Sequence, residues 1–114
     1  MTVRNLQSLA VSDLVEKFVE LALAKGEAIR GCDVTTTTRI YWKIDAINNE
    51  LESRVSDQRG VLRSLFDYPD DSVRLEAATA TLTLFPDEAR AVLKSVYEDG
   101  ELPVSAHAGM MLLD

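Results

Sequence analysis

The chain of 114 residues has a single cysteine, Cys32, and no long apolar run. A lone cysteine excludes a disulfide within the chain and is typical of a reducing compartment. The longest stretch without a charged residue is 102–113, whereas a helix that crosses a bilayer needs about 18–20 apolar residues. The N-terminus lacks the apolar core of a secretory signal. We therefore expect a cytoplasmic protein with no membrane partner.

Basic residues are also few. Twelve lysines and arginines stand against 19 aspartates and glutamates, which gives a net charge of −7. The basic residues are interspersed with acids, whereas nucleic-acid binding needs a basic face to hold phosphates. The five glycines are scattered, so the sequence has no glycine-rich phosphate loop. These absences argue against a nucleic-acid partner.

Apolar residues recur at helical spacing along the first half of the chain. Ser12 is a suitable N-cap for a first helix that ends by Gly31, although Gly26 could also end it. Asp33 is a suitable N-cap for a second helix over 34–55. The apolar stripe of this helix steps by 4, 3, 4 and 4 residues through Ile40, Ile44, Ile47, Leu51 and Val55. We therefore predict a long N-terminal helix pair over 12–55.

The second half of the chain predicts shorter helices. An apolar face over 61–66 precedes one over 73–84, and further helices begin near Pro86 and Pro103. The helix over 73–84, capped by Asp71 or Ser72, carries apolar residues on two sides, so we expect both sides to be buried. The alternation of threonine and apolar residues at its end would suit a strand, but the sequence has no second alternating segment that could pair with it. We therefore predict a single all-α domain over 1–114, with about six helices in antiparallel pairs.

The three prolines, Pro69, Pro86 and Pro103, follow one another at intervals of 17 residues, between predicted helices. This interval suggests a helix-pair repeat of about 30–35 residues. A shift of 31 residues aligns Leu62 with Leu93, Leu65 with Val96, Val73 with Val104, Ala77 with Ala108 and Leu82 with Leu113. We therefore predict two helix pairs over 58–114.

The segment 69–82 resembles the turn and second helix of a HEAT-type repeat. The residues that carry this likeness are Pro69, Asp70, Val73, Arg74, Ala77, Ala78 and Leu82. Together with residues 51–62, the chain is similar to a bacterial family of small HEAT-like domains of unknown function. The resemblance implies a fragment of an α-solenoid, in which Arg74 reaches a turn carboxylate such as that of Asp71 and links successive helix pairs.

The sequence contains no recognisable catalytic, cofactor-binding or metal-binding motif. His107 is the only histidine and lies in an apolar helix, without partners for a triad or a metal site. Cys32 has no CxxC context. The acids at 67–71 lack the order and the glycine of a calcium loop and suit helix capping instead. We expect no enzymatic activity, no cofactor and no metal.

Two groups of residues are candidates for an interface. Tyr41 and Trp42 are adjacent in a helix, so one of them points away from the apolar stripe unless a broad buried face uses both. Met110, Met111 and Leu113 belong to an apolar run at a position where a solenoid normally has a polar capping repeat. We therefore predict a non-enzymatic protein–protein interaction module, which binds a partner protein or forms a homodimer.

A second class of function stays open. Asp33, Asp45, Tyr41 and His107 carry side chains that could line a groove between helices and form a small-molecule-binding or catalytic site. These residues form one site only if the fold brings them together. A deep pocket lined by both Tyr41 and His107 would favour this alternative, and a filled core would argue against it.

Overall fold

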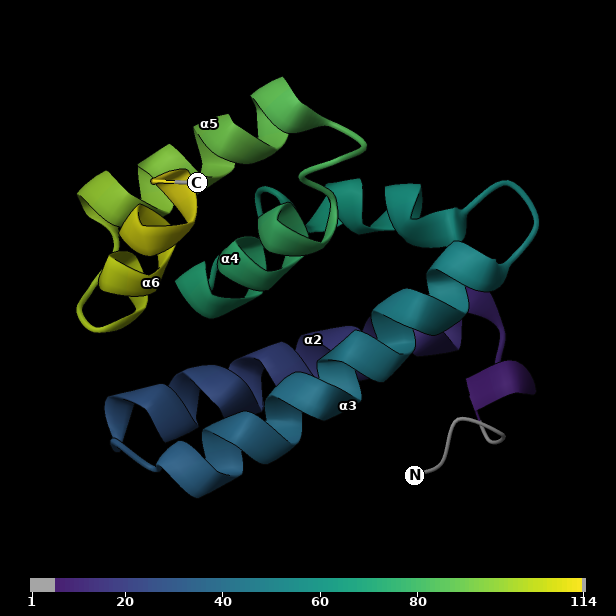
Figure 1. The fold of residues 1–114 in the computed structure, drawn as a ribbon, viewed down its shortest axis with the longest axis horizontal. Coiled ribbons are helices and arrows are strands. Elements are labelled where there is room, and N and C mark those ends of the chain that lie inside the picture. The colour runs from purple at the N-terminus through teal and green to yellow at the C-terminus, as the bar shows by residue number, and fades with distance from the viewer. Residues whose placement is uncertain (1–5, 114) are drawn as a thin grey trace.

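The computed structural model describes residues 6–113, and Figure 1 shows their arrangement. The elements in chain order are α2 (Val11–Arg30), α3 (Val34–Ser53), the 3₁₀ helix η1 (Gln58–Leu65), α4 (Asp71–Ala80), α5 (Pro86–Asp99) and α6 (Val104–Leu112). Within this part of the chain there is no strand, so the predicted all-α class with six helices is confirmed. Helices α2 and α3 form a long pair, and α4 lies between this pair and α5 with α6.

Helix α2 is continuous through Gly26, so the first helix ends only at Gly31. Leu14, Phe18 and Ala22 recur every four residues and are fully buried, because they lie on one side of the helix. The start of the helix differs from the prediction. Ala10 is the N-cap and makes no side-chain capping hydrogen bond, and the predicted cap, Ser12, lies inside the first turn.

Helix α3 begins at the predicted cap. The Thr36 backbone N–H donates to Asp33 Oδ1 at 3.0 Å, and the predicted stripe is buried from Ile40 to Leu51. The end of the helix comes earlier than predicted. Ser53 is its last residue, so Val55 lies beyond the helix and is 88% exposed instead of completing the stripe.

Helix α4 is buried on two sides, as its sequence predicts. Val73 and Ala77 belong to the apolar core shared with α2, α3 and η1, whereas Leu75 and Ala78 belong to a second core with α5 and α6. The N-cap is Asp70, one residue before the predicted position, and it accepts from the Ser72 backbone N–H at 2.7 Å. A central helix with two apolar sides therefore joins the two cores.

The predicted helix over 73–84 is too long. Helix α4 ends at Ala80, so Leu82 lies in the following turn and is only partly buried. Thr81 is fully buried in place of Leu82, and its hydroxyl donates to the Ala77 carbonyl oxygen at 2.8 Å. This local bond satisfies the polar group and closes the helix end.

The two predicted helix pairs of the second half have matching buried positions, but their first helices differ in type and length. Residues aligned by the 31-residue shift are buried in both halves at Leu62 and Leu93, Leu65 and Val96, Val73 and Val104, and Ala77 and Ala108. However, η1 is an 8-residue 3₁₀ helix, whereas α5 is a 14-residue α-helix. The radius of gyration is 13.4 Å, as expected for a compact chain of this length. The structure thus shows paired helices in a compact all-α globule.

Candidate functional site

Tyr41 and Trp42 both lie on the outside of α3. Trp42 lies opposite the buried stripe of α3 and is 62% exposed, whereas Tyr41 lies on the flank of the stripe and is 48% exposed. Their rings meet edge to face, with centroids 5.0 Å apart and planes at 80°. This geometry is favourable for an aromatic pair. The structure therefore presents two large aromatic side chains together at the surface.

Tyr41 is itself held against α2 by a charged side chain. The Lys25 Nζ lies 5.5 Å from the centre of the Tyr41 ring, in a cation–π contact. The same Nζ is 2.9 Å from Glu76 Oε2 on α4, and both side chains are mostly buried, at 13% and 11% exposed. A chain of contacts therefore runs from α4 through α2 to the aromatic pair on α3.

Trp42 lines a groove of about 370 Å³ along α3. The other lining residues on this helix follow Trp42 at helical spacing and form one stripe: Asp45, Ala46, Asn49, Glu50 and Ser53. Gln7, from the segment before α2, lines the groove as well. We call this feature the Trp42 groove.

An ion pair holds the N-terminal segment in place beside α3. Arg54 Nε lies 2.6 Å from Glu50 Oε2, and Arg54 Nη2 donates to the carbonyl oxygens of Leu6, at 3.1 Å, and Leu9, at 2.8 Å. Glu50 is only 8% exposed, so this pair is well shielded from water. The position of Gln7 in the Trp42 groove therefore depends on contacts that link residues more than 40 positions apart in the chain.

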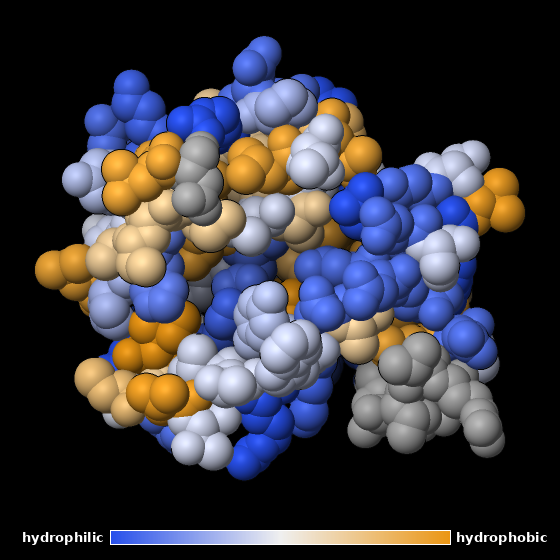
Figure 2. Space-filling view, in the orientation of Figure 1, coloured by the Kyte–Doolittle hydropathy of each residue, from blue (hydrophilic) through white to orange (hydrophobic). Residues whose placement is uncertain are grey.

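The predicted apolar residues of the last helix are partly at the surface. Met110 is 65% exposed and Leu113 is 87% exposed, whereas Met111 is partly buried in the second core. Beside them, Tyr97 of α5 is 55% exposed and its ring lies against Gly109. Figure 2 shows apolar side chains gathered over α6 near the C-terminus. We call Tyr97, Met110 and Leu113 the C-terminal apolar surface.

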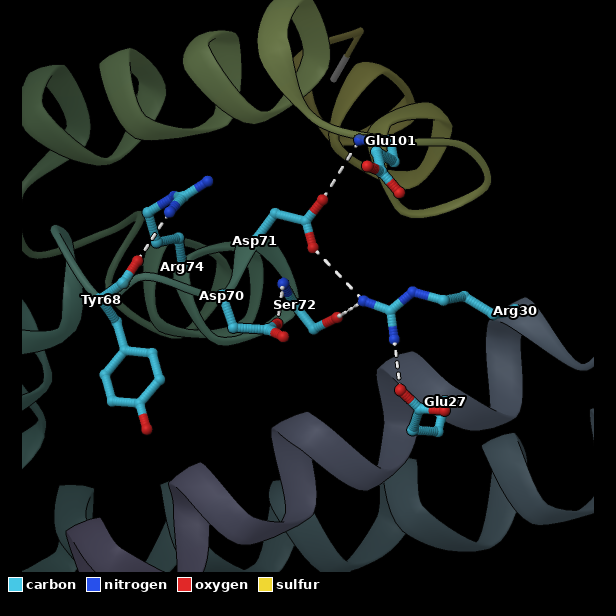
Figure 3. A network of polar contacts seen from close by, with 8 residues as sticks. All are labelled: Glu27, Arg30, Tyr68, Asp70, Asp71, Ser72, Arg74 and Glu101. Atoms are coloured by element: carbon cyan, nitrogen blue, oxygen red, sulfur yellow. Dashed lines mark hydrogen bonds and ion pairs between the residues drawn. The ribbon is translucent and has the colours of Figure 1, made fainter.

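The pairing of Asp71 with Arg74 that the HEAT resemblance implied is replaced by other contacts (Figure 3). Asp71 Oδ1 lies 3.5 Å from Arg30 Nη2 on α2, and Asp71 Oδ2 accepts from the Glu101 backbone N–H at 3.2 Å. Arg74 Nη1 instead donates to the Tyr68 carbonyl oxygen at 2.6 Å. Asp71 therefore does link separate helices, but through Arg30 and the α5–α6 loop, while Arg74 stabilises the turn before its own helix.

The residues proposed for a small-molecule or catalytic site lie in different places. Asp33 and His107 line one pocket of about 330 Å³ between the α2–α3 turn and the start of α6, together with Cys32. Asp45 lines the Trp42 groove, and Tyr41 packs against Trp42 and Lys25. The structure thus brings together two of the four predicted residues. Sequence reasoning missed the contribution of Cys32, which has a left-handed backbone with φ of 56°.

Two aspartates at helix starts have a lowered pKa. The hydroxyl of Thr36 donates to Asp33, and the Thr36 backbone N–H adds a second bond, so the pKa of the Asp33 carboxyl is lowered. The Arg59 guanidinium donates to Asp57 at 2.9 and 2.7 Å, which lowers the pKa of Asp57 and raises that of Arg59. Each contact favours the ionised carboxylate.

No group of three or more histidine, cysteine, aspartate or glutamate side chains in residues 6–113 is arranged to hold a metal ion. None of the helices formed by these residues combines the length and apolar character needed to cross a bilayer.

The fold is shared with a protein of known structure. The chain is 34% identical to the protein in the "Crystal Structure of the Protein RPA1889 from Rhodopseudomonas palustris CGA009", with a TM-score of 0.87 over 94% of this chain and 88% of that chain. No match is found among curated proteins. A family model described as "Domain of unknown function (DUF2019)" matches residues 12–114. The chain therefore belongs to the DUF2019 family.

Proposed function

We propose that this domain is a non-enzymatic protein–protein interaction module, built as a short HEAT-like stack of helix pairs. The observation that carries the proposal is the C-terminal apolar surface, where Met110 and Leu113 are 65% and 87% exposed. Contiguous apolar side chains on the surface of a globular domain mark a site that another molecule covers. The last pair of a helical stack needs a polar outer side to stay soluble, and α6 instead presents apolar residues there.

A second copy of the chain is the occupant that this surface favours. The adjoining face of α5 carries two acids and two bases, Asp87, Glu98, Arg90 and Lys94, beside a shallow groove that Leu112 also lines. This local balance reduces, at the contact itself, the repulsion that a net charge of −7 causes between two copies. An apolar centre with a rim of mixed charge is the usual composition of a protein interface.

Light scattering coupled to gel filtration tests this proposal. We expect the mass of a dimer at high protein concentration and a monomer for the double variant Met110→Glu/Leu113→Glu. Val55→Glu is the matched control, because Val55 is 88% exposed but follows α3 and lies outside the C-terminal apolar surface. A wild-type chain that stays monomeric at the highest concentration would contradict self-association. Equal dimerisation of the wild type and the double variant would contradict the use of this surface.

The pocket lined by Cys32, Asp33 and His107 favours a second candidate function, the binding of a small molecule. Its lining is mostly apolar, with a thiol, a carboxylate and an imidazole at its edge, which is a common composition for ligand sites. A fragment screen by NMR tests this candidate. Saturable shifts of the His107 and Cys32 resonances in the wild type, with the Cys32 shifts lost in His107→Ala, would support it, and the lack of any such shift would eliminate it.

A further inference from the structure

The Trp42 groove has a chemistry different from that of the C-terminal apolar surface. An indole lies at one end, and the carboxylates of Asp45 and Glu50 line the groove beyond it. An aromatic face attracts a cation through its quadrupole, and a carboxylate pairs with one directly. The groove therefore offers the two groups that recognise an organic cation.

Only one of the two carboxylates is available for an external cation. Glu50 is already paired with Arg54 at 2.6 Å. Within residues 6–113, the Asp45 side chain accepts one hydrogen bond, from Asn49 Nδ2 at 3.3 Å, and takes part in no ion pair. Asp45 follows Trp42 by three positions, so the carboxylate and the indole lie on the same side of α3. Their spacing allows one bound group to contact both.

The indole rests against Tyr41 in the absence of a partner. Tyr41 lies edge to face against Trp42 at 5.0 Å, and Tyr41 in turn contacts Lys25, which is paired with Glu76. An exposed aromatic side chain normally loses rotational freedom on binding, and this loss weakens affinity. The contacts behind Trp42 reduce that loss, as expected for a residue that makes a specific contact.

We propose that the Trp42 groove binds an arginine side chain of a partner protein, with the guanidinium stacked on Trp42 and paired with Asp45. Arginine fits better than lysine, because its planar guanidinium stacks on aromatic rings and pairs with a carboxylate through two parallel bonds. The net charge of −7 also favours the approach of a basic segment. This inference rests on the proposed function, since it gives the chemistry of a protein partner, but it uses a separate surface.

The fluorescence of Trp42 provides a direct test, because it is the only tryptophan in the chain. The probe is a short peptide with one arginine between glycines, and its control has citrulline in place of arginine, which keeps the shape but removes the charge. We expect a saturable change in emission with the arginine peptide and at least about tenfold weaker binding of the citrulline peptide. Equal responses to the two peptides, or no response to either, would overturn the proposal.

A pair of variants separates the groove from the general charge of the protein. Asp45→Asn keeps the fluorescence of Trp42 and the hydrogen bond with Asn49 but removes the negative charge. We expect this variant to bind the arginine peptide about fivefold more weakly. Asp67→Asn makes the same change in net charge at an exposed position outside the groove and should leave binding unchanged. Circular dichroism of both variants establishes that they fold. An equal loss in both variants would show non-specific attraction and overturn the proposal.

Light scattering on the same samples distinguishes failure of this inference from failure of the proposed dimer. A dimer that does not bind the arginine peptide would overturn the inference alone. A monomer that binds the peptide in an Asp45-dependent manner would support the inference and contradict self-association.

Discussion

Gly26 of α2 lies directly against Ser72 of α4. A Cβ atom placed on Gly26 would lie 2.8 Å from Ser72 Cβ and closer still to the Ser72 hydroxyl, so α2 and α4 approach at a distance that only glycine permits. Gly26 is buried inside a continuous helix, where glycine costs about 1 kcal/mol relative to alanine. The close contact between the two helices explains why this cost is tolerated.

Gly26→Ala is therefore expected to destabilise the domain by about 1–2 kcal/mol, because the steric clash with Ser72 outweighs the gain in helix propensity. Urea denaturation followed by circular dichroism measures the change. Gly31→Ala is the matched control, since a Cβ there would make only ordinary contacts, 3.5 Å or more from its neighbours. We expect Gly31→Ala to be neutral or slightly stabilising. A stability gain in Gly26→Ala would show that the two helices can separate without cost.

Removal of one partner of the Lys25–Glu76 ion pair is expected to destabilise the domain, because the charge that remains is shielded from water. Lys25→Met leaves the Glu76 carboxylate, 11% exposed, without its cation, and should destabilise the domain by about 3 kcal/mol. The double variant Lys25→Met/Glu76→Leu should recover most of this loss, because no unpaired charge is then buried. The measurement is the unfolding free energy of all three proteins. If the double variant is as unstable as the single one, the loss comes from packing and not from charge.

Most of the fold could be predicted because helical periodicity is a local property. The stripe from Ile40 to Leu51 and the two apolar sides of α4 both follow from spacing within one element, and both are confirmed. Helix ends were predicted less well. Val55 and Leu82 fit the apolar pattern but lie past the last helical residue, since a pattern of apolar residues does not show where backbone hydrogen bonds stop.

The contacts between helices could not be predicted in the same way. Arg30 is 41 positions from Asp71 and Lys25 is 51 from Glu76, and only the packing of α2 against α4 brings each pair together. The resemblance to a HEAT-type repeat instead implied Arg74 as the partner of Asp71. The exposure of Trp42 follows from its place opposite the stripe, whereas the position of Gln7 in the Trp42 groove depends on Arg54.

Asp71 is expected to couple energetically to Arg30 more strongly than to Arg74. The Asp71 side chain is 14% exposed and that of Arg30 is 33% exposed, so the pair is partly screened and Asp71→Asn should cost about 1 kcal/mol. Double-mutant cycles with Arg30→Met and Arg74→Met measure the two couplings by urea denaturation. A larger coupling to Arg74 would restore the pairing that the HEAT resemblance implied and contradict the observed geometry.

The stability of the domain is expected to fall in acid, with part of the loss due to Asp33 and Asp57. Both carboxyls have a folded pKa below the ordinary value of 3.8, because hydrogen bonds from Thr36 and Arg59 favour the ionised form. A lowered pKa contributes stability that is complete above the unfolded pKa and is lost as the pH falls through the folded pKa. The contribution should therefore be complete above about pH 4 and disappear as the pH falls through the lowered pKa of each carboxyl.

Asp33→Asn and Asp57→Asn isolate this effect. Each variant lacks the ionisable carboxyl, so the stability difference between wild type and variant should be largest near neutral pH and shrink as the pH falls below the unfolded pKa. Chemical denaturation at a series of pH values measures the difference. Asp67→Asn, at an exposed position, is the control and should remain close to the wild type throughout. A difference for Asp33 or Asp57 that does not change with pH would mean that the charge of the carboxylate at these two helix starts contributes nothing to folding.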